Sequence, residues 1–269
     1  DHRVLSGEDA DYTFADVHQA VATLCLRYPR DTMMRKGLEL GATLAPINDV
    51  EDLLLFDHLE LRHFWRHATQ GCGFDNERLP GGFVCFDGER SSGGRQPPHL
   101  DEHGREIRSE LAKAGQPLIA RTVNSSELPL EALKVVDFAW VGVGPITAKA
   151  LADHGATVVR VESGGRLDPL RINPPFKDRI FGENMSQFFG TFNTSKLGID
   201  IDLKNETGQE IARNLIAWAD VVIESWSPGA FSRAGFDDEA IASLNPSAIV
   251  VHTSLLASGG PLSPLAGYG

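Results

Sequence analysis

Apolar residues follow two different periods along the second half of the chain. Short apolar runs alternate with stretches in which apolar residues recur every three or four positions. The runs predict strands, and the stretches between them predict helices. The predicted strands are 134–139, 157–161, 197–203, 219–224 and 249–254, and the main predicted helices are 145–154, 207–219 and 237–245. This alternation is typical of a parallel sheet with helices on its faces, so residues 129–269 are predicted to form an α/β, Rossmann-like domain.

The first half shows mostly helical periodicity with a few short strands, which predicts a smaller α+β segment. Helices are expected at 14–28, at 31–40 with Gly41 as the stop, from a cap at Asp49, and from Asp101 to about Ala114 with Ile107 and Leu111 facing inward. Strands are expected at 42–47, from Phe64, and at 82–86 before the Asp87-Gly88 turn, followed by an exposed loop at 89–98.

Residues 116–128 have no strong periodicity and are interpreted as a linker. The sequence therefore predicts a segment 1–115, a linker 116–128 and a domain 129–269.

Charge and cysteine content narrow the possible partners. The net charge of −12 argues against general nucleic-acid binding, and no apolar run reaches the length of a transmembrane helix. The three cysteines have no framework spacing, and no signal-peptide pattern is present, so we expect a reduced, cytoplasmic protein with no nucleic-acid or membrane partner.

The stretch from Lys134 to Glu162 predicts a strand, a glycine loop, a helix and a second strand. Pro145 suits the first position of the helix, and Gly155 suits a left-handed residue just past its end. Such a unit places a helix N-terminus at the carboxyl end of the first strand. That position favours the phosphates of a nucleotide-containing ligand.

A nicotinamide cofactor is one interpretation of this loop, with Glu162 as the acid for the ribose. The third position of the dinucleotide fingerprint, however, is Thr147 instead of glycine or alanine. A plain tight turn explains Gly142 and Gly144 better than a nicotinamide site does.

Other charged residues have a functional and a structural interpretation. Lys196 and Arg233 could each meet a phosphate, or could be a solvated loop lysine and a surface salt bridge. His58, His63 and His67 are close in sequence, but core packing explains them better than a metal site.

Many pieces of the second half together resemble one family. They are VVDFAWVGVGPITAKALADHGATVVRVE, DPLR, FFGTFNTSKLGIDIDLKNETGQE, ADVVIESWSPGAFSRAGF and LNPSAIVVHTS. In this order and spacing, residues 129–269 resemble the start of a family III CoA-transferase, of the CaiB/BaiF group.

The first half resembles the end of that family. The segments concerned are GLELGATLAPINDVEDLLLFDHLELRHFW and PPHLDEHGREIRSEL, in which Asp101 stands where glycine is usual and Gly104 where threonine is usual. The chain thus runs tail first and head second. Our hypothesis is a junction between two fused copies, with a circular permutant as the alternative; a parent reading frame with a single copy would refute it.

The resemblance implies covalent catalysis by an aspartate, which attacks an acyl-CoA thioester and later carries CoA as an aspartyl-CoA thioester to an acceptor carboxylic acid. It implies no metal. The aspartate is expected beyond Gly269, so no catalytic residue is assigned within this chain, and the fragment alone is expected to be inactive. Full-length members are interlocked dimers, which a tandem could mimic as an intramolecular pseudo-dimer.

The resemblance also implies which residues contact CoA. Ser163 stands where a basic residue often follows the second strand, which weakens one expected phosphate contact. The implied residues are Trp140, Val141, Gly142, Val143, Ser163, Asn193, Lys196, Ser225, Trp226 and Arg233.

Three alternatives to CoA transfer stay open from the sequence. The first is an α-methylacyl-CoA racemase of the same family, which exchanges protons through paired acid and base groups. The second is a non-catalytic CoA-binding copy. The third is an NAD-dependent oxidoreductase.

Overall fold

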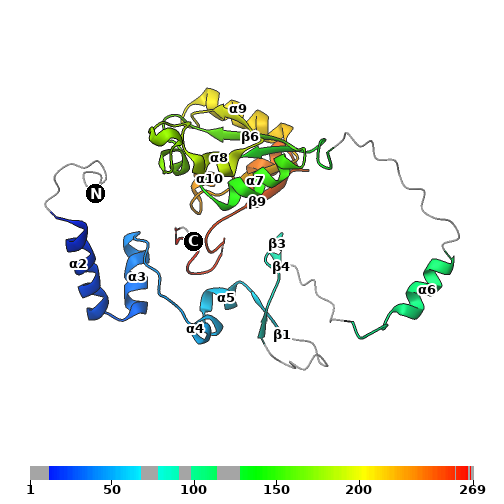
Figure 1. Ribbon diagram of the computed structural model, residues 1–269, viewed down its shortest axis with the longest axis horizontal. Coiled ribbons are helices and arrows are strands. Elements are labelled where there is room, and N and C mark those ends of the chain that lie inside the picture. The colour runs from blue at the N-terminus through cyan, green and yellow to red at the C-terminus, as the bar shows by residue number, and fades with distance from the viewer. Residues whose placement is uncertain are drawn as a thin grey trace. The chain divides into compact units, whose positions relative to one another are not determined.

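The computed structural model describes residues 12–67, 78–90, 98–113, 128–257, 259–265 and 267. Figure 1 labels its helices and strands. The chain divides into two compact units. One unit combines residues 1–64 with the segment 258–269, and the other comprises residues 65–257. The predicted linker 116–128 lies outside the described residues except for Leu128.

The first unit contains the predicted helices α2 (Phe14–Arg27), α3 (Arg30–Leu40) and α4 (Val50–Leu54). It also contains α5 (Asp57–Leu61), which the sequence analysis did not predict. Asp49 caps α4 in a capping box with Asp52, and Gly41 ends α3 with a φ of 68°. Both signals act as expected, because a carboxylate satisfies free amides at a helix start and glycine tolerates the left-handed conformation at its end.

The predicted strand at 42–47 is wrong, because the structure has no strand there. An extended segment becomes a strand only when a neighbour pairs with its backbone, and Pro46 has no amide hydrogen to donate. The same unit joins distant parts of the sequence. The Leu262 amide donates to Nδ1 of the buried His58, 204 residues away, over 3.3 Å.

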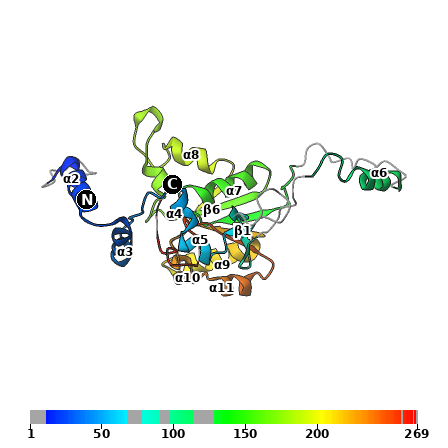
Figure 2. The ribbon, with the colours of Figure 1, turned by 90° about the horizontal axis from the view of Figure 1, so that it is seen from below.

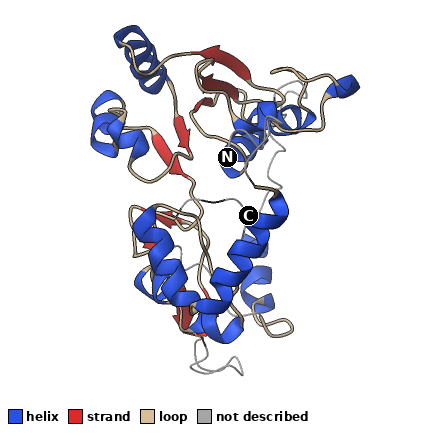
Figure 3. Ribbon diagram, turned by 90° about the vertical axis from the view of Figure 1, so that its left-hand side faces the viewer, coloured by secondary structure: helices blue, strands red, loops and turns tan. Residues whose placement is uncertain are grey.

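The second unit begins with two short antiparallel pairs, drawn in red among the strands of Figure 3. β1 (Trp65–His67) pairs with β2 (Arg78–Pro80), and β3 (Cys85–Phe86) pairs with β4 (Glu89–Arg90) across the Asp87-Gly88 turn. The predicted strand at 82–86 is thus shorter than expected, and the predicted loop at 89–98 begins with β4. Residues 91–97 of that loop lie outside the described residues.

Helix α6 (Gly104–Lys113) begins three residues later than predicted. Ile107 and Leu111 are 53% and 70% exposed, so the expectation that they face inward is wrong for the described residues. The amphipathic pattern is present, but no described element covers the apolar side.

A five-stranded parallel sheet forms the main body of this unit, in the order β7-β6-β5-β8-β9. The strands are β5 (Lys134–Asp137), β6 (Thr157–Glu162), β7 (Leu197–Asp200), β8 (Val221–Glu224) and β9 (Ile249–His252). All five were predicted, and the α/β fold class is confirmed. The strand order reverses direction between β5 and β8, which is where ligands bind in doubly wound sheets.

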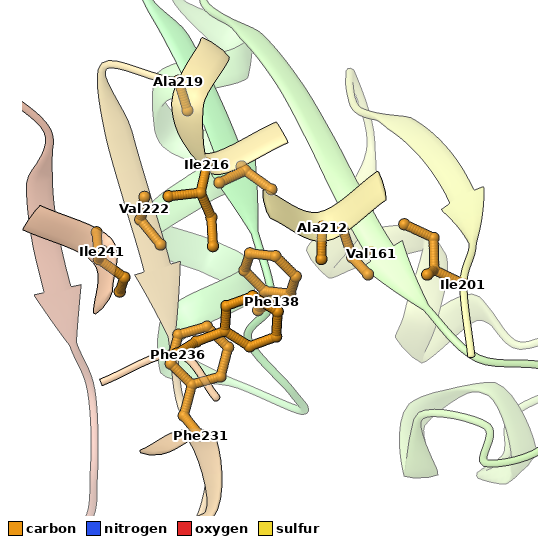
Figure 4. Close-up of a cluster of buried hydrophobic side chains, with 11 residues drawn as sticks. Phe138, Val161, Ile201, Ala212, Ile216, Ala219, Val222, Phe231, Phe236 and Ile241 are labelled. Atoms are coloured by element: carbon orange, nitrogen blue, oxygen red, sulfur yellow. The ribbon is translucent and has the colours of Figure 1, made fainter. Parts of the chain in front are cut away.

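Helices cover both faces of the sheet (Figure 2). α7 (Val143–Asp153) packs on one face through Ala148 and Ala152. On the other face, α9 (Glu206–Trp218), α10 (Ala230–Arg233) and α11 (Asp238–Leu244) enclose a larger apolar cluster around Phe138 (Figure 4). Its other large members are Ile216, Phe231, Phe236 and Ile241.

Local signals around α7 are confirmed with one change. Gly155 has a φ of 108°, as a residue past a helix end requires, but Pro145 is the third residue of α7 instead of the first. β6 and β7 are joined by two 3-10 turns, 169–172 and 177–179, and by α8 (Gln187–Asn193). In the part of the chain that the structure describes, no helix is long and apolar enough to cross a membrane.

Candidate functional site

The site is built from two loops at the carboxyl ends of neighbouring strands. β5 ends at Asp137 and β8 ends at Glu224, and the two strands pair directly in parallel. The loop after β5 leads into the first turn of α7, so amides of the helix N-terminus lie at this edge of the sheet. Such an edge is suited to an anionic ligand.

Hydrogen bonds join the two loops. Ser225 Oγ accepts from the Trp140 amide at 2.6 Å and donates to the Trp140 carbonyl at 3.1 Å. Trp226 Nε1 donates to the Phe138 carbonyl at 2.7 Å, and the Trp140 and Trp226 rings meet edge to face at 6.5 Å. Three residues predicted from the family resemblance are therefore brought together.

The two glycines of this loop have different roles. A Cβ on Gly144 would lie 2.3 Å from the Ala139 Cβ, so glycine allows α7 to pack closely on the end of β5. A Cβ on Gly142 would meet nothing within 4 Å. Val143 is 69% exposed, so Gly142 and Val143 present the open side of the loop.

Val141 has a φ of 59°, which is uncommon for a β-branched residue, and its amide donates to Asp168 Oδ2 at 3.2 Å. Asp168 is itself 2% exposed. The conformation of the loop thus depends on a buried carboxylate that follows β6.

Arg160 stands at the centre of a buried ionic network that the sequence analysis missed. Its guanidinium pairs with Asp168, lies 3.4 Å from Asp137 Oδ2, and donates to the Ala139 carbonyl at 2.8 Å. All three charged residues are 2% exposed or less. A signal was available, because a charged residue inside an apolar strand such as β6 needs a buried partner.

Lys196 completes this network. Its ammonium group donates to Asp137 Oδ2 and the Pro145 carbonyl, both at 2.8 Å, and to Asn193 Oδ1 at 2.9 Å. Burial lowers the pKa of Lys196, and the charge of Asp137 opposes that shift. With all three protons donated inside the protein, Lys196 ties the start of α7 to β5, and its contact with a phosphate stays a prediction.

Arg233 does not share the hydrogen-bond network of Lys196. Arg233 ends α10, whose Phe231 belongs to the apolar cluster on the face opposite to α7. Arg233 is exposed, and its guanidinium has no hydrogen-bond or ion-pair partner among the described residues. Its predicted ligand contact is therefore open, and Phe231 of the same helix packs edge to face on Trp226 at 5.4 Å.

Residues that follow β6 add charged side chains at the edge of the two joined loops, which is called the rim. Ser163 accepts from the Arg166 amide at 2.9 Å, and the Arg166 guanidinium lies 4.7 Å from the Trp140 ring centre. Both carboxylate oxygens of Glu162 accept from Arg171, at 2.9 and 2.6 Å. This bond raises the pKa of Arg171, and it engages the carboxylate that a nicotinamide ribose would need.

A second cluster of charged side chains, formed by Glu224, Asp238 and His252, contacts the backbone of Trp226. His252 Nδ1 is 2.7 Å from Glu224 Oε1, and its Nε2 is 3.0 Å from Asp238 Oδ1. The other Glu224 oxygen accepts from the Trp226 amide at 2.7 Å. The hydrogen bond with Glu224 raises the pKa of His252. Because Glu224 also accepts from the Trp226 amide, it links the protonation state of His252 to the backbone at Trp226.

Comparisons with known proteins agree with one another. The sequence profile of CoA-transferase family III matches residues 130–269. A succinate–glutarate CoA-transferase of Agrobacterium fabrum is 36% identical over 142 residues, which are 52% of this chain and 36% of that protein. A protein named "probable CoA-transferase" from Mycobacterium tuberculosis is 27% identical over 256 residues, which are 93% of this chain and 30% of that protein.

Among solved structures, a CaiB/BaiF family protein from Brucella suis is 38% identical, with a TM-score of 0.49. The match covers 53% of this chain and 37% of the Brucella chain. The chain spans about a third of the length of the curated relatives it matches.

Proposed function

The chain belongs to CoA-transferase family III, and on this premise we propose that it supplies the CoA-binding part of an enzyme that moves CoA from an acyl-CoA thioester to a carboxylic acid. The observation that carries the proposal is the pair of joined loops at the carboxyl ends of β5 and β8. Ser225 bonds both backbone groups of Trp140 there, at the start of α7.

In this proposal the nucleotide part of CoA lies over the loop Trp140–Val143. Gly142 leaves space for close approach, and the N-terminus of α7 favours negative charge. Arg233 contributes a further phosphate contact through its unpartnered guanidinium. Binding energy from this end of the ligand positions the distant thioester for reaction.

The proposed transfer has four balanced steps. An aspartate carboxylate attacks the thioester carbonyl and releases CoA thiolate, which leaves a mixed anhydride. CoA thiolate then attacks the aspartyl carbonyl, releasing the first carboxylate and forming aspartyl-CoA. The acceptor carboxylate attacks this thioester and again expels CoA thiolate. CoA finally attacks the acceptor carbonyl of the second anhydride and frees the aspartate.

The aspartates near the loop do not suit the nucleophilic role. Asp137 and Asp168 are both buried and paired with Arg160, and each also accepts backbone amides. A nucleophile must reach its substrate, so we place the attacking aspartate outside this chain. The chain alone is then expected to bind CoA without transferring it.

We further propose that residues 1–115 are the tail of one copy, 116–128 the linker, and 129–269 the head of a second copy. The Mycobacterium relative aligns with 93% of this chain, which supports the order of the two parts. Because 256 residues are 30% of that protein and 142 residues are 36% of the Agrobacterium protein, the Mycobacterium protein is about twice as long. The buried contact between His58 and Leu262 also joins the two parts, as an intramolecular pseudo-dimer would require.

The activity is tested on the complete parent protein, with this chain as the comparison. An acyl-CoA is mixed with a radiolabelled carboxylic acid, and label is followed into the CoA thioester. We expect the parent to transfer label and this chain alone to transfer none. Epimerisation of a 2-methylacyl-CoA without label transfer would favour the racemase instead. CoA binding without either reaction would favour a non-catalytic copy.

A further inference from the structure

Arg166 lies at the rim of the joined loops and is not among the residues expected to contact CoA. Its guanidinium carbon is 4.7 Å from the centre of the Trp140 ring, and the residue is exposed. An arginine held over an indole face gains a cation–π interaction and keeps the edge of its guanidinium free to donate.

Three other cations near this loop, Arg160, Arg171 and Lys196, are already engaged. Arg160 is buried against two aspartates, and Arg171 donates to both oxygens of Glu162. Lys196 donates all three of its protons within the protein. By contrast, the Arg166 side chain makes no hydrogen bond or ion pair with any residue that the structure describes.

The position of Arg166 is fixed by its neighbours on both sides. Its amide donates to the Ser163 carbonyl at 2.9 Å, and Asp168, two residues later, is buried against Arg160. Trp140, on which it stacks, is held by Ser225 through both backbone groups. A ligand therefore meets a cation whose backbone and stacking partner are both already ordered, which lowers the entropy cost of binding.

We propose that Arg166, stacked on Trp140, is a phosphate-binding residue of this site. Phosphate is the favoured ligand group because the guanidinium edge matches its oxygens in a bidentate geometry. The start of α7 adds positive potential at the same loop. This inference rests on the proposed function and deepens it, because the phosphate belongs to the nucleotide end of CoA.

The test compares ligand affinities of the wild-type chain, Arg166→Ala, Arg166→Lys and Arg213→Ala by titration calorimetry. Arg213 is an exposed arginine on α9, so its removal changes the net charge equally without touching the loop. The ligands are CoA, pantetheine, which lacks the nucleotide phosphates, and inorganic pyrophosphate.

We expect Arg166→Ala to bind CoA roughly 10- to 100-fold more weakly, which is the effect of losing a charge-assisted hydrogen bond. The CoA affinity of Arg166→Lys should lie between those of the wild type and Arg166→Ala, because lysine keeps the charge but loses the bidentate guanidinium edge. Pantetheine affinity should be equal in all four proteins, and Arg213→Ala should match the wild type.

Two results separate this inference from the proposed function. If Arg166→Ala binds CoA as tightly as the wild-type chain, the role of Arg166 is refuted while CoA binding stands. If the wild-type chain binds no CoA, the proposed function fails. The pyrophosphate titration then decides whether Arg166 still forms a phosphate site. Binding of pyrophosphate that is lost in Arg166→Ala would still support a phosphate site, and no binding of pyrophosphate would overturn it.

Discussion

At the scale of single residues, the cations around the loop differ in what they have left to donate. Lys196 is saturated by Asp137, Pro145 and Asn193, so its removal would first damage the protein. Arg233 is exposed and has no side-chain partner among the described residues, so its removal should first affect a ligand. The two residues looked equivalent in the sequence.

Arg233→Ala is expected to weaken CoA binding by about 1.5–3 kcal/mol, the effect of one hydrogen bond to a charged group. The thermal midpoint should change little, since no described contact of the guanidinium is lost. Calorimetric titration of the variant beside Lys204→Ala, which removes an exposed charge in the loop before α9, provides the measurement. An Arg233→Ala protein with wild-type affinity for CoA would remove Arg233 from the site.

His252 gives the folding stability of the protein a predicted dependence on pH. Its pKa is raised by the hydrogen bond with Glu224, so the folded state holds the proton more tightly than the unfolded state does. The resulting stabilisation is fully present below the unfolded-state pKa, near 6.5, and is lost as pH rises through the higher folded-state pKa. No comparable dependence is expected from a residue without a titrating side chain.

Urea unfolding of the wild type and His252→Gln at several pH values tests this expectation. The difference in unfolding free energy should be largest near pH ~5.5 and should shrink above pH ~8. Only the direction of this change is predicted, because the imidazole is 42% exposed and solvent screens its ion pair. A difference that grows with rising pH would contradict the assignment.

At the scale of elements, the glycine loop contains two glycines in different surroundings: Gly144 is closely packed and Gly142 faces open space. Gly144→Ala should destabilise the protein by about 1–3 kcal/mol, because the new Cβ would overlap Ala139 and push α7 away from β5. Gly142→Ala should change stability by less than about 0.5 kcal/mol, since a Cβ there meets open space. Equal losses in a thermal unfolding experiment would show that the loop is not packed as described.

The sequence was informative wherever a local rule decides the structure. Asp49 and Gly41 mark helix ends because capping involves only a few neighbouring residues. The apolar runs of β5, β6 and β8 reflect burial at the centre of the sheet. Local rules failed where a distant partner decides. The segment 42–47 has extended character but no pairing strand, and α6 has an apolar side that no described element covers.

The same distinction applies to the site. Trp140, Ser225 and Trp226 were predicted by resemblance, and the structure brings them together. The internal contacts of Lys196 were not predictable from its neighbours, because Asp137 is 59 residues away. Arg160 could have been noticed as a charge inside an apolar strand, but its pairing with Asp168 depends on a loop conformation that no periodicity describes.

At the scale of the whole molecule, the chain combines a five-stranded parallel sheet with a unit that joins residues 1–64 to the segment 258–269. Within that unit, a Cβ on Gly260 would come within 2.7 Å of the His58 ring, so the backbone at Gly260 packs closely against His58. The proposed tandem order gives this contact a function, because it would tie the tail of one copy to the head of the next.

The central claim is that the loops after β5 and β8 hold the nucleotide end of CoA. Calorimetric titration of the 269-residue chain with CoA, with NADH as the competing ligand, tests it most directly. The account predicts saturable binding of CoA, with a weaker response to NADH because Glu162 is engaged by Arg171. A chain that binds NADH more tightly than CoA, or binds neither, would contradict it.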